Sequence, residues 1–145
     1  MLVHQILRAK RDGAAVATVA PGCTVAEAAR MLSERRIGAL VVCSDSGPPV
    51  GILSERDIVR ELGRRGPAAL EDTVSAMMTR EVITCDPEDL ADGVLAKMTE
   101  QRCRHMPVLR EGEMVGLISI GDVVKARLDE LSMEKEALKG MIMGY

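Results

Sequence analysis

Apolar residues follow two spacings along this chain, and each spacing predicts one kind of element. Apolar positions at i, i+3, i+4 and i+7 predict a helix over 25–35, and Thr24 stands before it in the capping-box form Thr-x-x-Glu. The nearly continuous apolar run 37–43 predicts a strand that is covered on both faces. Alternating elements of this kind indicate a mixed α/β fold.

The same rules predict the other elements of the first half and the segment that connects it to the second half. The predicted elements are a short helical face within 1–11, a strand over 14–20, a turn at 44–49 with a returning strand over 50–53, a helix over 55–62 that ends at Gly63, a linker at 64–67, and a short apolar helix over 70–78.

The second half of the chain repeats the first. A shift of 66 residues aligns Thr84 with Thr18, Pro87 with Pro21, Met98 with Leu32, Glu100 with Glu34, Arg102 with Arg36, and Val108 with Val42. From Gly116 on Gly51 the shift is 65, because the second hairpin loop is one residue shorter. The matches keep their order, so the chain contains an internal duplication. One unit alone is too small to bury both faces of its sheet, and we expect the two units to pack around a pseudo-twofold axis with two equivalent clefts.

The stretch that the two halves share most clearly ends in Ser-x-x-Asp. Gly51-Ile-Leu-Ser-Glu-Arg-Asp-Ile-Val59 returns as Gly116-Leu-Ile-Ser-Ile-Gly-Asp-Val-Val124. A strand would deliver the two polar side chains to a helix N-terminus, where unpaired N–H groups and the helix dipole favour an anionic ligand. The same residues also have the form of a capping box, so a purely structural role stays open.

Composition narrows the classes of function. The 145 residues are 47% apolar and carry a net charge of −3, with no Phe or Trp, one Tyr and ten Met. Acidic charge and missing aromatic platforms argue against a nucleic-acid binder. No apolar run approaches the ~18 residues of a membrane span, and residues 1–10 lack a signal-peptide core, so we expect a cytoplasmic protein.

The four cysteines do not form a metal-binding pattern. They lack a C-x-x-C pair and a histidine at ligand spacing, so no metal is expected. Cys85 and Cys103 fall where the first half has Val19 and Ile37, and we expect both to act as small core residues.

The duplication, the two Gly-h-h-Ser-x-x-Asp motifs and Met106-Pro107-Val108 resemble a tandem pair of CBS domains, the Bateman module, as in stand-alone bacterial-type CBS domain proteins. The resemblance covers 14–126 and implies two repeats of strand-helix-strand-strand-helix. It divides the chain into a first repeat with an N-terminal helix (1–66), a second repeat (67–126) and a helical tail (127–145). The family more often has Thr at the two Ser positions, and its Pro is replaced by Val41 in the first copy.

The resemblance also implies a function, namely a regulatory module of signal transduction that senses energy or redox state without catalysis. Its ligands are adenosine compounds such as AMP, ADP, ATP, NAD or S-adenosylmethionine, whose ribose is held by the family's Asp and Ser. The implied first cleft comprises Ser54, Arg56, Asp57, Thr79, Val82, Ile83, Cys103, Arg104 and His105. The implied second cleft comprises Lys10, Val16, Ala17, Ile37, Gly38, Ala39, Ser119, Gly121 and Asp122.

The side chains of the two implied clefts differ in charge. Arg56 and Arg104 gather on the Asp57 side, which predicts that this cleft is the better phosphate site. The Asp122 side has Lys10 or Arg11 as its only sources of positive charge, and is expected to accept a bulkier dinucleotide or to stay empty.

Two other functions stay open. A small enzyme could use Asp57 and Asp122 as an acid and base, although no nucleophile with an adjacent base is visible. A structural homodimerisation protein would leave its clefts unoccupied. We expect a homodimer, and the tail adds a heptad seam to its contact. The sequence does not reveal any separate effector protein. The seam residues are Leu128, Leu131, Lys135, Leu138 and Ile142, and the alternative is a tail that folds back on its own domain.

Overall fold

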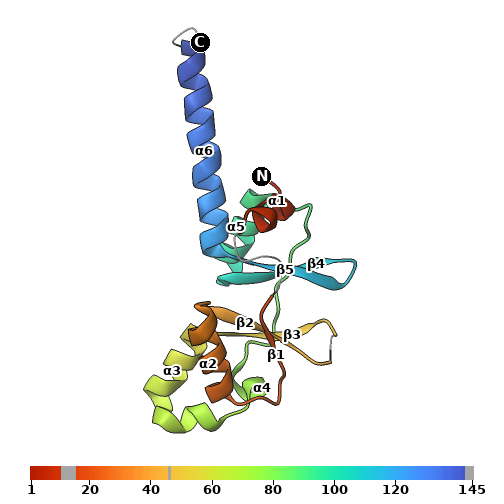
Figure 1. Cartoon of the computed structure of the whole chain (residues 1–145), viewed down its shortest axis with the longest axis vertical. Coiled ribbons are helices and arrows are strands. Elements are labelled where there is room, and N and C mark those ends of the chain that lie inside the picture. Colours follow the sequence, from red (N-terminus) through yellow and green to blue (C-terminus); the bar gives the residue numbers. More distant parts are fainter. Residues whose placement is uncertain (11–15, 46, 143–145) are drawn as a thin grey trace.

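The computed structural model describes residues 1–10, 16–45 and 47–142. In chain order its elements are α1 (Val3–Ala9), β1 (Thr18–Val19), α2 (Val25–Arg35), β2 (Ala39–Cys43), β3 (Pro49–Ser54), α3 (Glu55–Arg65), the 3-10 helix η1 (Gly66–Glu71), α4 (Val74–Met77), α5 (Ala91–Gln101), β4 (His105–Arg110), β5 (Glu113–Ser119) and α6 (Ile120–Ile142). The β2–β3 and β4–β5 hairpins lie side by side in the middle, with α2 and α3 beyond one and α5 and α6 beyond the other (Figure 1). This is the mixed α/β fold with a C-terminal helix that the sequence predicts.

The two units repeat the same strand pairing. In the first, β1 runs parallel to β2, and β2 pairs antiparallel with β3; in the second, β4 pairs antiparallel with β5. The register is interrupted after Val42 in the first hairpin and after Val108 in the second, which are equivalent positions. A shared irregularity at the same place confirms the internal duplication.

The units differ in the strand that precedes the hairpin: the first unit has β1, the second has no equivalent strand among the described residues, and a proline explains the difference. Val41 of the first unit donates its N–H to the Ala17 carbonyl oxygen at 3.2 Å, within the β1–β2 pairing. The equivalent residue of the second unit is Pro107, which has no N–H to donate. Only a parallel bridge between Cys85 and Val108 remains there. The first strand is also shorter than predicted, since only Thr18–Val19 of the range 14–20 is β-strand, and residues 14 and 15 lie outside the described residues.

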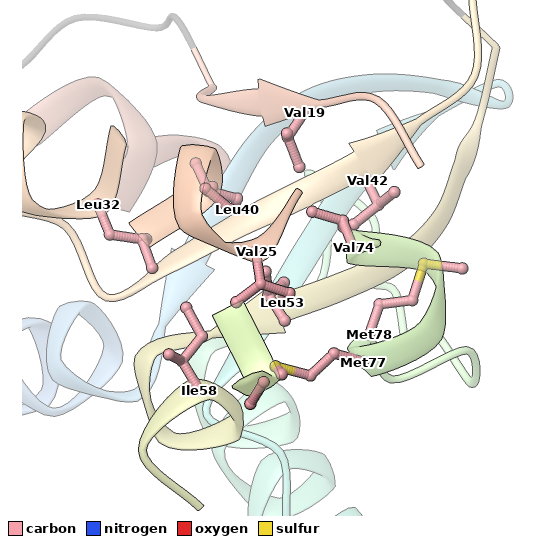
Figure 2. Packing of buried hydrophobic residues seen from close by; sticks show 12 residues of the cluster. Val19, Val25, Leu32, Leu40, Val42, Leu53, Ile58, Val74, Met77 and Met78 are labelled. Carbon is pink, nitrogen blue, oxygen red and sulfur yellow. The ribbon is translucent and has the colours of Figure 1, made fainter. Parts of the chain in front are cut away.

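Each unit has its own hydrophobic core, built from aliphatic side chains and methionines. The first contains Val19, Val25, Ala28, Leu32, Leu40, Val42, Leu53, Ile58, Ala69, Val74, Met77 and Met78 (Figure 2). The second contains Val3, Ile6, Cys85, Ala91, Val94, Met98, Met106, Val108, Ile118, Val123 and Ala126. Of the two cysteines predicted to be core residues, Cys85 is buried, whereas Cys103 is partly buried against the second core.

The short helices α1 and α4 are exchanged between the units. The N–H of Val3 in α1 donates to the Asp89 carbonyl oxygen of the second unit at 2.9 Å. The N–H of Val74 in α4 donates to the Cys23 carbonyl oxygen of the first unit at 2.7 Å. Val3 belongs to the second core and Val74 to the first. Each core is therefore completed by the helix that precedes the other unit in sequence.

Two helix boundaries differ from the predictions. Helix α3 continues through Gly63 to Arg65, because the Arg65 side chain pairs with Glu61 one turn earlier, at 3.0 Å, and stabilises the last turn. The predicted linker is therefore helical, first as the end of α3 and then as η1. The predicted helix over 70–78 is reduced to α4, because the extended Thr73 caps it and prevents an earlier start.

Helix α6 is a single continuous helix over the described residues. Its first turns bury Val123 and Ala126 against the second core. Its second half leaves the body of the molecule and does not fold back on it (Figure 1). No helix among residues 1–10, 16–45 and 47–142 is both long and apolar enough to cross a membrane.

Candidate functional site

Two clefts lie between the units, as the pseudo-twofold arrangement predicts. The Asp57 cleft has a volume of about 570 Å³ and is lined from β3, α3, the segment before Cys85 and the start of β4. The Asp122 cleft has a volume of about 630 Å³ and is lined from α1, β2, β5 and the start of α6. Both volumes lie within the usual range for small-molecule sites, ~300 to 1,000 Å³.

The structure brings most of the predicted site residues together. The Asp57 cleft is lined by Ser54, Arg56, Asp57, Thr79, Ile83, Cys103, Arg104 and His105. The Asp122 cleft is lined by Lys10, Val16, Ala17, Ile37, Gly38, Ala39, Ser119 and Asp122. Val82 does not line its predicted cleft, although Glu81 and Ile83 on either side of it do. Gly121 is exposed and does not line its cleft, since it has no side chain to reach inward from the first turn of α6.

Asp57 stands at the start of α3 with most of its acceptor capacity engaged. The backbone N–H and the hydroxyl of Ser54 donate to its Oδ2 at 2.9 and 3.1 Å, and Arg60 donates to its Oδ1 at 3.1 Å. The N–H of Asp57 donates to Ser54 Oγ at 3.3 Å, which completes a capping box. Only 7% of Asp57 is exposed, and among the described residues it is the only buried charged one. Desolvation of this carboxylate is offset by these donors.

Asp122 occupies the equivalent position at the start of α6 and is more open. Its Oδ2 accepts the N–H of Ser119 at 2.9 Å and pairs with Lys10 Nζ at 3.0 Å, while its N–H donates to Ser119 Oγ at 3.1 Å. Lys10 Nζ also donates to the Leu117 carbonyl oxygen at 2.9 Å, so α1 is tied to β5. Burial raises the pKa of Asp122, but the donors from Ser119 and Lys10 outweigh it and hold the pKa below its ordinary value. No hydrogen bond to Asp122 Oδ1 is found within the described part of the chain, and this oxygen is left to accept one.

A thin wall separates the two clefts. Gly38, His105 and Ser119 each line both of them. A Cβ atom at Gly38 would lie 3.6 Å from His105 Nε2, so any side chain at position 38 would touch the imidazole. The two clefts therefore share side chains.

The imidazole in this wall is held neutral by its surroundings. Burial lowers the pKa of His105, and the nearby cations Lys10 and Arg104 lower it further, whereas the carboxylates of Asp122 and Glu55 oppose the shift. At neutral pH His105 thus presents an uncharged ring to both clefts.

Cations line both clefts, which corrects the expected difference between them. Arg35 and Arg36 line the Asp122 cleft in addition to Lys10, so Lys10 and Arg11 are not its only sources of charge. Arg11 lies outside the described residues. Arg36 and Arg102 adopt the left-handed conformation, with φ of 53° and 54°, at the ends of α2 and α5, and each lines one cleft. The alignment of Arg102 with Arg36 in the repeat indicates that the two arginines occupy equivalent places, one at each cleft. Arg56, Arg60, Arg102 and Arg104 line the Asp57 cleft, and its rank as the better phosphate site stays a prediction.

The arrangement is suited to binding. Asp57 and Asp122 line different clefts, so they do not form a carboxylate pair of the kind that acid-base catalysis uses. Burial raises the pKa of the Cys103 thiol in the Asp57 cleft, which keeps it protonated and a poor nucleophile. Among the residues described, no group of three His, Cys, Asp or Glu could hold a metal ion.

Comparisons with known proteins place this geometry in a family. The CBS domain family model matches residues 14–64 and 74–129. The crystal structure of a CBS-domain containing protein from Agrobacterium tumefaciens is 42% identical, covers 88% of this chain and 99% of its own, and has a TM-score of 0.82. The CBS domain pair of protein MJ0100, solved in complex with 5′-methylthioadenosine and S-adenosyl-L-methionine, is 26% identical with a TM-score of 0.78, over 90% of this chain and 98% of its own. A mitochondrial CBS domain-containing protein of Arabidopsis thaliana is 35% identical over 83% of this chain, which spans 61% of that relative's length.

Proposed function

This chain belongs to the CBS-domain family, and on that premise we propose that it is a regulatory module that binds an adenosine-containing ligand in the clefts between its two units. The observation that carries the proposal is the repeated Asp at a helix N-terminus, in clefts that aliphatic side chains and arginines also line. The adenosine ligands named for the MJ0100 domain pair support the same chemical class.

Each part of an adenosine nucleotide has a matching surface in a cleft. The carboxylate of Asp122 has a free oxygen that could accept hydrogen bonds from the ribose diol. Aliphatic side chains such as Ile37 would face the adenine, whose edge can bond to backbone groups. Arg36 would meet the phosphates, since a guanidinium binds phosphate bidentately. No aromatic side chain is needed for this arrangement.

The proposed ligands are AMP, ADP, ATP, NAD and S-adenosylmethionine, and the proposed role is the sensing of energy or redox state in the cytoplasm. No catalytic step is assigned to the module. Binding would act on a separate effector protein through the surface of the module. The clefts share His105, so a ligand in one cleft contacts a side chain that the other also uses.

We also propose that the module works as a homodimer. A groove of about 450 Å³ between α2 and α3 is lined by Leu32, Ile58, Val59 and other apolar residues, and by the polar residues Ser33, Arg36 and Glu55. Val59 is exposed, and its equivalent Val124 is exposed on α6. The two helical layers therefore present apolar residues at matching positions, which a second copy could cover.

A thermal shift assay with AMP, ADP, ATP, NAD, NADH and S-adenosylmethionine tests the ligand class. A ligand at 100 times its Kd should stabilise the fold by ~2.7 kcal/mol and raise the melting temperature by several degrees. CMP, which has the ribose and phosphate without adenine, serves as the control. No shift with any adenosine compound, at concentrations up to several millimolar, would rule the proposal out.

That outcome would favour the second candidate, a structural homodimerisation protein with unoccupied clefts. The observation in its favour is that the Ser and Asp of both motifs form complete capping boxes with each other. In that case Asp57 and Asp122 would stabilise helix starts and nothing more.

A further inference from the structure

Helix α6 carries an apolar stripe that no other described residue covers. The exposed fraction is 62% for Leu128, 58% for Leu138 and 84% for Ile142, and Leu131 is also exposed. The C-terminal part of α6 extends beyond the body of the molecule (Figure 1). A helix of this kind gains little stability in water by itself, because most helical stability comes from packing of an apolar face.

The stripe has the spacing of a coiled-coil seam. From Val124 the residues follow steps of four and three, through Leu128, Leu131, Lys135 and Leu138 to Ile142. In heptad terms Leu128, Lys135 and Ile142 stand at a, and Val124, Leu131 and Leu138 at d. The seam thus runs from the exposed helical face at Val124 to the end of the described helix.

Charges beside the seam distinguish the two possible orientations. In a parallel pair, each g residue faces the e residue five positions later on the other helix. Glu134 stands at g and Lys139 at e, so a parallel pair joins opposite charges twice. In an antiparallel pair with the same apolar layers, Glu134 faces Glu134, and Lys125 faces Lys139. Like charges then meet on both flanks.

Other charges on the helix are already used within the chain. Arg127, which also stands at g, pairs with Asp92 at 2.8 Å and with Glu130 at 3.2 Å. Lys135 at a places two cations in one layer of a pair, which lowers affinity but favours a two-stranded assembly in one register. The features agree on one partner, namely the same helix of a second copy.

We propose that α6 of one copy pairs in parallel and in register with α6 of a second copy, so that Glu134 of each faces Lys139 of the other. This inference rests on the homodimer proposed above and adds its contact and its orientation. It places the two pairs of clefts at the same end of a joint helical stalk.

Charge exchange tests the pairing. Glu134→Lys and Lys139→Glu should each raise the dimer Kd about tenfold, since attraction becomes repulsion at two contacts. The double variant should restore the wild-type Kd. Glu136→Lys makes the same charge change at b, away from the seam, and should leave the Kd unchanged. Sedimentation equilibrium gives the Kd, and failure of the double variant to recover it would contradict the proposed contact.

A cysteine substitution tests the orientation. Leu138→Cys places a thiol in a d layer, where two parallel helices bring the same position together. Mild oxidation should give a disulfide between the two copies at position 138, identified by peptide mapping, and Leu138→Ser is the control. A dimer without this disulfide, or with position 138 crosslinked elsewhere, would refute the parallel arrangement.

The same variants separate this inference from the ligand proposal. Leu131→Glu with Leu138→Glu should convert the dimer to a monomer, while the thermal shift with adenosine ligands persists, because both positions lie outside the clefts. A dimer that survives this double change would overturn the α6 pairing and leave the α2–α3 surface as the homodimer contact. A trimer or larger assembly of the wild-type chain would overturn it equally.

Discussion

Replacing Asp122 with Ala should weaken an adenosine nucleotide in the Asp122 cleft. Its Oδ2 is occupied by Ser119 and Lys10, whereas its Oδ1 is left to accept hydrogen bonds from the ribose hydroxyls. Asp57 has less capacity left, because Ser54 donates twice to one oxygen and Arg60 donates to the other. Asp57→Ala should therefore weaken the ligand in its own cleft by a smaller factor.

The size of the effect follows from the number of hydrogen bonds lost. A hydrogen bond to a charged acceptor contributes ~1.5 to 3 kcal/mol, and a ribose diol can make two of them with one carboxylate. Part of this is recovered when water fills the space, so a loss of ~3 kcal/mol is expected, or roughly a hundredfold in Kd. The Lys10 ammonium is left without its carboxylate and could pair with a ligand phosphate, which makes this an upper value.

Calorimetric titration with AMP at fixed ionic strength measures the two affinities. Because Asp122 also caps a helix, Thr24→Ala is a matched control. Thr24 Oγ1 accepts the N–H of Glu27 at 3.2 Å at the start of α2, outside both clefts, so its loss lowers stability without touching a ligand. If Asp122→Ala binds AMP as well as Thr24→Ala does, the carboxylate is a helix cap alone and the reasoning is refuted.

Three further predictions concern stability. Lys10→Met should weaken the loss of stability in acid, because the lowered pKa of Asp122 stabilises the fold above the unfolded-state pKa and this stabilisation is lost as pH falls. Urea titrations should show that the variant loses less free energy of unfolding than the wild type between pH 7 and about pH 3. An equal loss would contradict the pairing of Lys10 with Asp122. His105→Asn should make the free energy of unfolding less dependent on pH between pH 7 and about pH 5. The pKa of His105 is lowered in the folded protein, so the unfolded chain binds the proton more tightly and the wild type loses stability on acidification. A variant as pH-sensitive as the wild type would count against this. Gly51→Ala should destabilise the fold by ~1 to 3 kcal/mol in thermal unfolding, since its methyl group would lie 3.0 Å from the Thr79 carbonyl oxygen. Gly116→Ala should cost less, because its methyl group meets only the Leu7 side chain. The reverse order would show that the Leu7 side chain cannot move.

Much of the fold could be predicted because its signals are local. The apolar face of α2 and the cap at Thr24 are contained in adjacent residues, and the prediction of residues 25–35 was confirmed. The duplication could be predicted because it compares the chain with itself. The end of α3 could not, since it depends on the pairing of Arg65 with Glu61, whereas the start of α4 is marked in the sequence by its cap Thr73 and was missed. Propensity at Gly63 was outweighed by the pairing of Arg65 with Glu61.

The site could be predicted only as far as the repeat reached. Ser54, Asp57 and their second copies are contained in the motif, and the structure places them at the cleft rims. Arg36 was missed because its reach into a cleft depends on a left-handed backbone at the end of α2, which no residue type there requires. The absence of Val82 from its cleft could not be predicted from the repeat either, because its equivalent Val16 does line the other cleft.

The exchange of α1 and α4 gives the order in which a growing chain can complete its cores. The first core closes as soon as α4 has been synthesised, because its other members precede it. Helix α1 is made before the second unit, yet its binding surface there is complete only after the start of α6 has been made. Val3 and Ile6 must therefore stay without their partners through most of translation. The residues of α1 are therefore made before the rest of the module but placed among the last, and until then they are open to chaperones.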